Sequence, residues 1–435
     1  MKIGLEAHIY PGVPSKLFCA CAVPMMCPVC TAQPGSKPMA VNRKAVEDTI
    51  KVALALKCRV MERITFMRKQ YFYPDLPANF QRTSTPFGAD GGLKDIGIKE
   101  VHLEEDAGRL DLKTGKVDFG RAGTPLIEIV TEPCMKSPSE ATEFLKNLSD
   151  LMRYIGVSYP LRFKVDTNIS LAEARVEVKN IGSIKGVKTA FEYEAQRQGK
   201  VISSGGKVLG ETRHYDEDTG RTFSAREKET EDDYRKIPDA DLPDYDISVA
   251  LRSISRKISE DLFERRARYM KTYTLSREAC IAVTPTPGFA ELFERLAAKF
   301  PPAFVGEWIR SDLIGELSYR GIFPEDAKPD EGRLESLLGK YASGGISKLR
   351  ARIMLRELLD KGSWKERPAD VDVSKAVREV MERHKDAVQK LKRGKKVIAD
   401  FLVGEVSQAL GFQIHPQKIR EEMEKVLEKT VQIKI

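Results

Sequence analysis

The stretch LRFKVDTNISL, from Leu161 to Leu171, alternates apolar with polar side chains along most of its length. A period of two is typical of a β-strand that buries one face. The stretch RVEVK, residues 175–179, repeats the pattern, so we expect a returning antiparallel strand there. The polar face of such a strand pair usually contacts water, and a surface that holds a substrate is the sharper alternative.

Beyond about residue 250 the strand pattern ends and helical spacing takes over. Apolar side chains recur every three or four residues, and prolines and glycines separate the segments. The predicted helices run from Leu251 to Met270, Gly288 to Phe300, Phe304 to Tyr319, Leu334 to Tyr341 and Ser347 to Leu359. A linker is expected from Lys361 to Pro368, followed by a last helical unit over residues 373–435.

Two further helices are predicted within the strand-rich part. Residues 42–56 place their apolar side chains on one side. The second helix has Ser137 as its capping residue, a proline at its first position, Glu140 three residues after the cap, and Gly156 as its stop. By contrast, residues 212–236 are so polar that we expect a loop or flexible segment there.

A run of three carboxylates lies in HLEEDAG, residues 102–108. Like charges repel, so burying them is costly unless a cation shares the site. A second acid and an imidazole occur near the start of the chain, and a lone acid sits in the apolar run TPLIEIV, residues 124–130. Such groups suit magnesium, which takes oxygen ligands and often bridges phosphate. The candidates are Glu6, His8, Glu104, Glu105 and Glu128. A solvated turn with a paired core acid is an equal alternative on spacing alone.

Four of the seven cysteines form a C-x-C pair and a C-x-x-C pair, five residues apart. Paired cysteines of this kind build the tetrahedral thiolate site of structural zinc, whereas disulfides are uncommon in the cytosol. The candidate ligands are Cys19, Cys21, Cys27 and Cys30. A reduced cluster without metal is the alternative. Cys58, Cys134 and Cys280 lack such spacing and are expected to be ordinary buried thiols.

Two basic segments are candidates for RNA binding. In RKQYFYPDLP, residues 68–77, cations stand beside aromatic rings, as in loops that grip phosphate and stack on bases; core packing of the rings is an equal alternative. Residues 373–435 hold fourteen Lys and Arg against nine Asp and Glu, a balance of +5, although basic runs are usually solvated faces. The candidates are Arg68, Lys69, Tyr71, Tyr73, Lys392, Arg393, Lys395 and Lys396.

The composition bounds the class of protein. A chain of 435 residues with 41% hydrophobic and 31% charged residues predicts two or three domains with buried cores. Its apolar runs are far shorter than the roughly 18 residues of a membrane span, and no signal segment precedes the first folded pattern. We therefore expect a soluble, cytoplasmic protein without membrane contact. The net charge of +8 permits a nucleic-acid partner.

Taken together, the motifs resemble the GatB family, the B subunit of the glutamyl-tRNA(Gln)/aspartyl-tRNA(Asn) amidotransferase. The matching stretches follow the family's order over nearly the whole chain. They read GLEAH, SKLFCAC…CPVC, RKQYFYPDLP, VHLEEDAG, VDFGRAGTPLIEIVTEP, VEVKNIGS with EYEAQRQ, GETRHYDEDTG, DYRKIPDADLP, GEWI and GKKVIADFLVGEV. A paralogous subunit in archaea carries an inserted domain resembling an aspartyl-tRNA synthetase, and this chain has no room for it.

The resemblance implies an α+β fold. A cradle-shaped catalytic domain with a mixed or antiparallel sheet would span residues 1–250 and carry a zinc knuckle at residues 19–30. An all-helical domain would follow over residues 251–368. A small helical, tRNA-binding tail domain would occupy residues 373–435.

The resemblance also implies the activity of a carbon–nitrogen ligase with glutamine as amido donor. ATP phosphorylates the side-chain carboxylate of Glu-tRNA(Gln) or Asp-tRNA(Asn), and ammonia then displaces the phosphate. The implied partners are an amidase subunit, which makes the ammonia, a small third subunit that completes a heterotrimer, and tRNA(Gln) or tRNA(Asn). The implied cofactors are ATP, Mg²⁺ and Zn²⁺.

Two functions of different classes follow. One is the kinase and transamidation subunit, in which Glu6, His8, Glu104, Glu105 and Glu128 hold magnesium for catalysis. The other is a zinc-stabilised tRNA-binding protein of the same fold without catalysis. The acids favour the enzyme, because phosphoryl transfer between two anions depends on charge neutralisation and positioning, which a binding module does not need.

Overall fold

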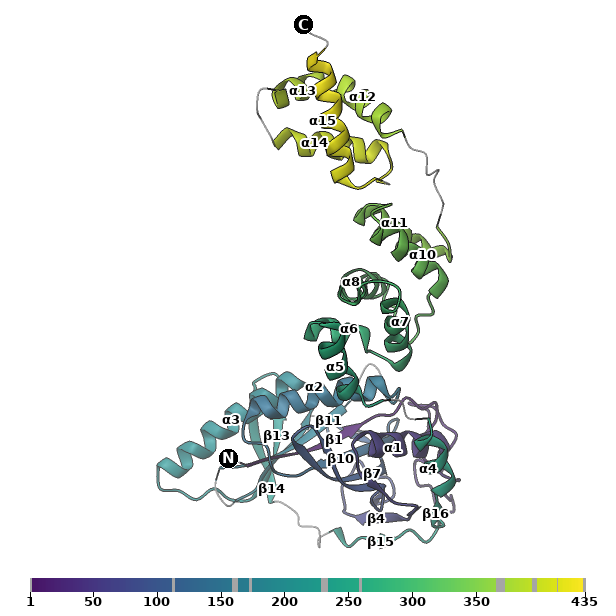
Figure 1. Ribbon diagram of the computed structural model, residues 1–435. Helices are drawn as coiled ribbons and strands as arrows, with labels where there is room; N and C mark the ends of the chain where they lie inside the picture. Colours follow the sequence, from purple (N-terminus) through teal and green to yellow (C-terminus); the bar gives the residue numbers. More distant parts are fainter. Residues whose placement is uncertain are drawn as a thin grey trace. The chain divides into compact units, whose positions relative to one another are not determined.

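The computed structural model of the chain describes residues 2–111, 114–158, 163–171, 174–227, 234–257, 260–364, 372–392, 397–412 and 414–432. The chain divides into two compact units, Met1–Glu264 and Arg265–Ile435. The first unit contains both strands and helices, with β2 (Arg59–Val60) to β10 (Pro125–Thr131) following one another between α1 (Arg43–Ala55) and α2 (Pro138–Tyr154), and the described part of the second unit is helical (Figure 1). The fold is therefore α+β.

A twelve-stranded sheet organises the described part of the first unit. Its main path runs β14 (Arg221–Glu227), β13 (Glu211–Asp216), β12 (Val176–Ile181), β11 (Phe163–Ser170), β1 (Lys2–Ile9), β10 (Pro125–Thr131), β7 (Ile96–Glu105), β5 (Phe80–Ser84), β4 (Phe66–Gln70) and β15 (Ile237–Pro238). β6 (Gly88–Leu93) also pairs with β7, and β2 (Arg59–Val60) pairs with β6. Among these described strands β12 and β13 pair in parallel, and the other pairs are antiparallel. The sheet is therefore mixed.

Two small ribbons accompany the main sheet. β3 (Arg63–Ile64) pairs with β16 (Tyr245–Asp246), and β8 (Arg109–Leu110) pairs with β9 (Val117–Asp118). The segment that contains β15 and β16 follows the hairpin of β13 and β14 in the chain and returns to pair with β4 and β3.

The strand pair predicted from period-two alternation is confirmed. β11 and β12 run antiparallel, with Ile169 opposite Val176. The polar side of this pair is not wet, because Asp166 and Asn168 are only 8% and 7% exposed. This face is therefore a buried polar surface.

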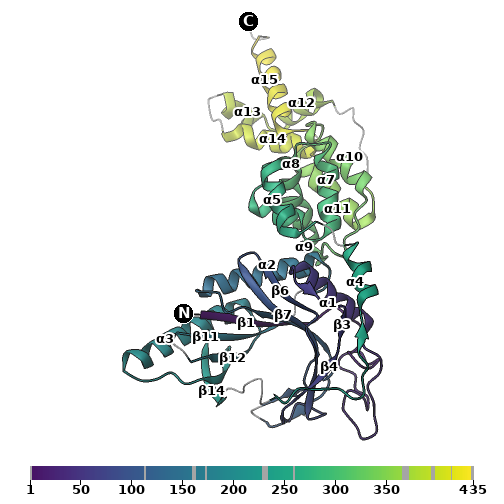
Figure 2. The same ribbon diagram turned by 60° about the horizontal axis from the view of Figure 1, so that its bottom comes forward.

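Three helices cover the apolar side of the sheet: α1 (Arg43–Ala55), α2 (Pro138–Tyr154) and α3 (Ile184–Ser203). Figure 2 shows α2 and α3 on the same side of the strands. Ile3 and Leu5 of β1, Ile127 of β10, Leu148 of α2 and Phe191 of α3 belong to one buried cluster. The alternation of the strands therefore sends one set of side chains into this core and the other set to the polar face.

Both helices predicted in this unit are confirmed, as is the predicted cap at Ser137, and the structure adds a cap at Asn42. The Asn42 side chain accepts from the Ala45 amide before α1, and Ser137 Oγ accepts from the Glu140 amide at 3.2 Å before α2. Gly156 follows α2 with a φ of 67°, a conformation in which a side chain would be strained. The residues after β12 form α3, a helix that we did not predict from the sequence.

The expectation of a loop over residues 212–236 is wrong for most of the segment. β13 and β14 form a hairpin whose register runs from Glu211 opposite Glu227 to Asp216 opposite Arg221. High polarity predicts solvent contact, but Arg213 and Thr222 in this hairpin are buried. Residues 228–233 of the expected loop lie outside the described residues.

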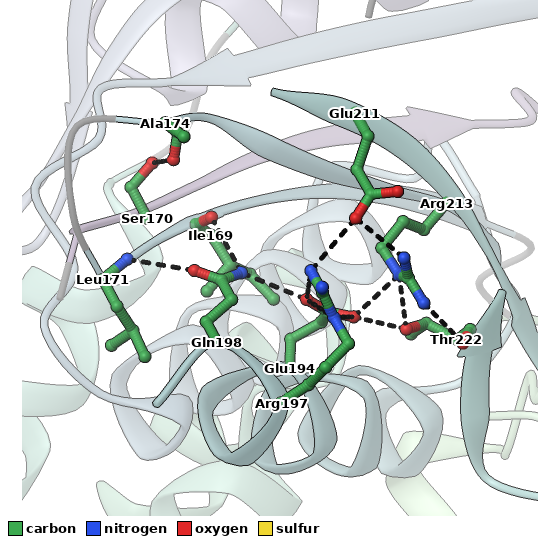
Figure 3. A network of polar contacts seen from close by, with 10 residues as sticks. All are labelled: Ile169, Ser170, Leu171, Ala174, Glu194, Arg197, Gln198, Glu211, Arg213 and Thr222. Carbon is green, nitrogen blue, oxygen red and sulfur yellow. Dashed lines mark hydrogen bonds and ion pairs between the residues drawn. The ribbon is translucent and has the colours of Figure 1, made fainter. Parts of the chain in front are cut away.

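A buried polar network explains how this hairpin folds (Figure 3). Glu194 of α3 is fully buried and accepts from Arg197 Nη2 at 2.8 Å and from the Thr222 hydroxyl, and it lies 3.0 Å from Arg213 Nε. Gln198, one turn further along α3, donates to Glu194 at 3.1 Å. Ion pairs to α3 therefore offset the cost of burying the polar hairpin.

The network also fixes the ionisation of its central acid. Burial favours the neutral carboxyl of Glu194, but hydrogen bonds from Arg197, Thr222 and Gln198 outweigh it and lower the pKa. Gln198 also accepts from the Leu171 amide at 3.2 Å, which ties α3 to the end of β11. The carboxylate of Glu194 is thus charged at neutral pH and holds three elements together.

The single helix predicted from Leu251 to Met270 is wrong. The chain forms α4 (Ser248–Ser255) and then α5 (Leu262–Tyr273), and residues 258 and 259 lie outside the described part. Asp261 Oδ1 accepts from the amides of Phe263 and Glu264 at 2.8 and 3.0 Å. An aspartate cap therefore starts a new helix inside a continuous apolar pattern.

The remaining described helices belong to the second unit. They are α6 (Arg277–Val283), α7 (Pro287–Ala297), α8 (Pro302–Trp308), the π-helical η2 (Ile309–Leu313), α9 (Ile314–Tyr319), α10 (Glu331–Ala342), α11 (Lys348–Lys361), α12 (Val373–Arg383), α13 (Lys385–Lys392), α14 (Val397–Ala409) and α15 (Pro416–Gln432). Two separate apolar clusters form, one between Tyr269 and Leu358 and one between Val377 and Met423. Within the described residues, none of the helices combines the length and apolar character that a membrane crossing requires.

Candidate active site and metal centre

The strand register brings three distant acidic stretches to one polar face. His8 of β1 is opposite Glu128 of β10, and Glu128 is opposite His102 of β7. Glu6 and Glu104 are each two residues from a member of this row, so they share its face. Residues predicted from three separate motifs therefore converge on adjacent strands.

The closest group within this face is His8, Glu104 and Glu128. His8 Nε2 lies 3.4 Å from Glu104 Oε1 and 3.6 Å from Glu128 Oε1. Burial disfavours the imidazolium, but the hydrogen bond with Glu128 and the negative charges of both acids outweigh it and raise the pKa of His8 to about 9. At neutral pH His8 is therefore a cation between two carboxyl groups.

The two acids of this group titrate in opposite directions. Burial and repulsion from Glu128 raise the pKa of Glu104 to about 7. Burial also acts against ionisation of Glu128, but the hydrogen bond and charge of His8 prevail and hold its pKa well below the usual range. When the pKa values of two neighbouring acids differ in this way, one acid can accept a proton near neutral pH while the other remains a fixed negative charge.

Glu6 lies on the same face with a different set of partners. Its Oε1 accepts from Asn168 Nδ2 at 3.0 Å and lies 3.5 Å from Arg175 Nη2. Burial, with the charges of nearby acids led by Glu128, raises the pKa of Glu6. Lys179 Nζ lies 2.9 Å from Asp166 and places a cation in the same part of the face. Lys179 was not among the predicted site residues.

Glu105 points away from this group. It follows Glu104 on β7, and its Oε2 accepts from Arg82 Nη1 at 3.2 Å. Arg82 Nε also donates to Asp239 Oδ2 at 2.7 Å, and Arg68 Nη2 donates to the other oxygen of Asp239 at 2.9 Å. The adjacent acids therefore serve different clusters, one with His8 and one with the arginines.

The third carboxylate of the run has its own partners. Asp106 Oδ2 accepts from the Tyr10 hydroxyl at 2.6 Å and lies 2.9 Å from Arg121 Nε, and Asp106 Oδ1 accepts from Lys164 Nζ at 3.4 Å. Glu104 and Asp106 are only 3% and 6% exposed. The alternative of a solvated turn is therefore wrong, because cations on other strands compensate each buried charge.

The candidate RNA-binding loop borders the acid face. Arg68 pairs with Asp239 and Asp241, each at 2.9 Å. Lys69 Nζ lies 4.5 Å from the centre of the Tyr234 ring, which also packs edge-on against Tyr71 at 5.9 Å. Burial opposes the charge of Lys69, but the acids Glu104 and Glu128 raise its pKa. Tyr234 was missed as a site residue, although it lies in the quoted motif DYRKIPDADLP.

The other RNA candidates are placed differently. Tyr73 is exposed, as is its neighbour Phe72. Lys392 is the last residue of α13. Arg393, Lys395 and Lys396 lie outside the described residues.

Four cysteines form a second candidate site. The sulfur atoms of Cys19, Cys21, Cys27 and Cys30 all lie within 4.8 Å of one another, so they could hold one metal ion. Sulfurs at the zinc–sulfur distance of about 2.3 Å in a tetrahedron are about 3.8 Å apart, so the cluster lies within about 1 Å of this spacing. Cys27 and Cys30 are already at 3.9 Å.

The thiols of the cluster differ in acidity. Burial opposes ionisation of Cys27, but hydrogen bonds from the Cys30 amide and the Cys21 thiol lower its pKa to about 7. Burial together with the neighbouring sulfurs raises the pKa of Cys19. Close packing of the four thiols therefore favours ionisation of Cys27. Ionisation of the other thiols would bring like charges together, which is unfavourable unless a cation binds.

The other cysteines are mostly as expected. Cys58 and Cys280 are buried, but Cys134 is exposed, so the expectation of burial is wrong for it. Cys134 lies just beyond β10, where the next residue, Met135, takes the inward position and pairs with Ile3.

Comparison with known families gives this arrangement its context. Residues 1–252 match the model of the GatB/GatE catalytic domain, and residues 291–427 match the model of the GatB domain. The chain belongs to the GatB family of amidotransferase subunits. The resemblance seen in the motifs is thereby confirmed.

Three relatives within the GatB family align over nearly the whole chain. Each is named as the B subunit of an aspartyl/glutamyl-tRNA(Asn/Gln) amidotransferase. The Methanocaldococcus jannaschii relative is 38% identical, with 99% of this chain and 98% of the relative covered. The Methanopyrus kandleri relative is 37% identical with 96% of each covered. The Methanothermobacter thermautotrophicus relative is 38% identical with 97% and 99% covered.

Both candidate sites fall within the first of the two matched stretches. The stretch matching the GatB/GatE catalytic domain contains the acid face, the four cysteines and the strands that position them. The stretch matching the GatB domain spans α7 to most of α15. In this member of the GatB family, the acid face and the four-cysteine cluster thus both lie in the stretch that matches the catalytic domain.

Proposed function

We propose that the chain is the subunit of a tRNA-dependent amidotransferase that activates and amidates a tRNA-bound amino acid. With ATP it phosphorylates the side-chain carboxylate of Glu-tRNA(Gln), Asp-tRNA(Asn) or both, and ammonia then gives Gln-tRNA(Gln) or Asn-tRNA(Asn). The observation that carries the proposal is the group of His8, Glu104 and Glu128 on adjacent strands, because it combines a fixed negative charge with an acid whose pKa is about 7.

The reaction has two balanced steps. An oxygen of the substrate carboxylate attacks the γ-phosphorus of ATP, the bond from that phosphorus to the bridging oxygen breaks, and ADP leaves. The lone pair of ammonia then attacks the carbonyl carbon, and phosphate leaves with the oxygen it had gained. Ammonia loses a proton in this step, and Glu104 is the acid of the group suited to accept it near neutral pH.

Magnesium suits the acid face. Bound there, it would neutralise phosphate charge as the two anions approach each other. We assign Glu6, His8, Glu104 and Glu128 to hold it, since buried acids of like charge require a cation. His8 would be a ligand in its neutral form, because the metal ion would replace the charge of the imidazolium between the two acids and release its proton. Glu105 is assigned to hold Arg82 beside the site, because that pair is already formed.

Zinc is the metal we propose for Cys19, Cys21, Cys27 and Cys30. The four sulfurs form a closed donor set of soft ligands, as structural zinc requires, and no position for a reacting group is needed. The ion would hold residues 19–30 next to the strand ends that carry Glu105 and Asp106.

The proposal includes partners. An amidase subunit would supply ammonia and a small third subunit would complete a heterotrimer, as the family resemblance implies. For tRNA, exposed Tyr73 together with Lys69 and Tyr71 beside the acid face would approach the acylated end. Arg68 would support that loop through its aspartate pairs. Lys392, Arg393, Lys395 and Lys396 would contact phosphates elsewhere on the tRNA.

The test is amidation by the complex purified from its native cell with its partner subunits. Glu128→Gln should lower the rate of tRNA amidation by roughly 10²–10³, the scale of losing a preorganised electrostatic group. The affinity for tRNA should change little, and free ammonia should not restore activity, because the lost step precedes its attack. Glu132→Gln, which alters an exposed acid four residues further on, is the matched control.

Two outcomes would contradict the proposal. Rescue of Glu128→Gln by ammonia would place the defect in ammonia delivery rather than in phosphorylation. A wild-type complex that binds acylated tRNA but never consumes ATP would favour the alternative of a zinc-stabilised tRNA-binding protein.

A further inference from the structure

Lys16 is a buried cation beside the four-cysteine cluster. Its side chain is 1% exposed. Among the described residues its ammonium has one hydrogen bond, which Nζ donates to Cys30 Sγ at 3.3 Å. A neutral thiol is a weak acceptor and leaves a buried ammonium uncompensated. The ammonium of Lys16 is therefore placed to donate to a sulfur that becomes a thiolate when the cluster binds a metal ion.

The backbone places Lys16 over the cluster. The Lys16 amide donates to the Cys21 carbonyl at 2.9 Å, and the next amide, of Leu17, donates to the Gly123 carbonyl at 2.8 Å. Gly123 suits this turn because its φ is 79°, a conformation that strains other residues, and a methyl group built there would lie in ordinary contact, 3.4 Å from Cys30 Cβ and 3.7 Å from Lys16 Cδ. The lysine stem is thus packed between the cysteine loop and the turn before β10.

We propose that Lys16 is a positioning residue of the metal centre, whose ammonium donates to the Cys30 thiolate and offsets part of the excess charge of the site. Four thiolates around a divalent ion leave two negative charges in excess, and one ammonium removes half of that excess. The inference rests on the proposed zinc site and concerns a residue outside its ligand set.

The same cation lies close to the second acid cluster. Burial raises the pKa of Glu105, and the charges of Arg82 and, to a smaller extent, of Lys16 act against this rise. Arg82 in turn reaches Asp239. Lys16 therefore stands between the cysteines and the arginine cluster, and losing its charge would leave both sides more negative.

The experiment measures the metal directly in full-length protein. Lys16→Met keeps the length of the side chain and removes the charge, and Lys16→Arg keeps the charge and its donors. We expect Lys16→Met to lower the affinity for zinc by roughly 10–100-fold in competition with a chromophoric chelator, as for other partners of metal ligands. Lys16→Arg should recover part of this loss. Lys207→Met, at an exposed lysine, is the control.

A second measurement separates charge from packing. With cobalt in place of zinc, the thiolate-to-metal absorption bands of Lys16→Met should move to lower energy, because a sulfur without its N–H donor is richer in electrons. A purely structural role for Lys16 would leave these bands in place. If Lys16→Met is insoluble, Lys16→Gln serves instead, since it keeps an N–H donor without the charge and should bind zinc with intermediate affinity.

Wild-type affinity and wild-type cobalt bands in Lys16→Met, or in Lys16→Gln where that is used, would overturn the inference. The zinc assignment itself has a separate check. Wild-type protein that carries no zinc would overturn the proposed metal, whereas zinc in the wild type that Cys27→Ser abolishes and Lys16→Met leaves untouched would overturn only the role of Lys16.

Discussion

Glu104 and Glu105 are neighbours in the chain and belong to different clusters. Successive side chains of a strand point to opposite faces, so Glu104 joins His8 on the polar face while Glu105 joins Arg82. The first has a histidine as its nearest cation and a second acid close by. The second pairs with Arg82 and lies beside the cysteine loop.

We expect substitution of Glu104 to affect mainly the rate of amidation, and substitution of Glu105 to affect mainly the stability of the fold. Glu104→Gln should lower the rate of amidation by roughly 10² or more and leave the folded state stable, because it removes charge from the reacting face. Glu105→Gln should instead lower the free energy of unfolding by about 1.5–3 kcal/mol, since it weakens a hydrogen bond to a buried charged group. Amidation assays and denaturant unfolding of both variants measure this difference.

Equal loss of activity with unchanged stability in both variants would contradict this division.

Glu104 and Glu105 also show how much of the site the sequence could predict. Motifs and residue types identified all the acids, but two adjacent glutamates have identical chemistry. Only the register of β7 against β10 assigns one of them to the polar face.

At the scale of elements, the sequence predicted helices correctly where the apolar spacing and any predicted cap both lie within the helix segment itself. The apolar spacing of residues 42–56 predicted α1, and the cap at Ser137 with the apolar spacing after it predicted α2, because these signals lie within a few residues of each other. Residues 212–236 were misread because polarity normally indicates solvent contact. There the partner that buries the hairpin is Glu194, which lies in a different element and is recognisable only in the folded chain.

Glu194 makes the stability of α3 and of the β13–β14 hairpin depend on pH. Its pKa is lowered in the folded state from the ordinary value of 4.5, so its contribution to stability is complete above that pH and is lost as the pH falls through the folded-state pKa. At neutral pH, Glu194→Gln should cost about 1.5–3 kcal/mol, because Arg197 and Arg213 lose their fully buried partner and keep only Glu211, at 3.2 and 2.8 Å. The difference between variant and wild type should shrink below pH 4.5.

Hydrogen exchange of the α3 amides over a pH series is the appropriate measurement. Tryptophan fluorescence would miss the effect, because Trp308 and Trp364 both lie in the second unit. Glu192→Gln, at an exposed acid on the same helix, should change stability by less than about 0.5 kcal/mol. A difference between Glu194→Gln and wild type that stays constant down to acidic pH would contradict the role of the carboxylate.

At the scale of the molecule, the second unit contains two apolar clusters with no shared members among the described residues. The cluster between Val377 and Met423 lies wholly within the basic tail. Removing residues 372–435 should therefore leave the first cluster intact and reduce tRNA affinity through lost phosphate contacts. Each lost contact should flatten the log–log salt dependence of binding by about one unit.

Binding titrations of the full-length and shortened chains at several salt concentrations measure this slope. Substituting Lys390, Lys392, Arg393, Lys395 and Lys396 by glutamine in the full-length chain controls for loss of the tail's fold. Identical slopes and affinities in all three proteins would remove the tail from the tRNA-binding surface.

The central place of β1 in the sheet has a consequence for how the chain is made. β1 leaves the ribosome more than a hundred residues before β10 and β11, the strands that flank it. At about 5–20 residues per second, the residues between β1 and these two strands take roughly 6–30 s to synthesise, and during that time Ile3, Leu5 and Ile9 lack a partner strand on one or both sides. A nascent chain that ends before Ser170 therefore leaves β1 without at least one of its two partner strands, and we expect chaperones to hold it until synthesis passes that residue.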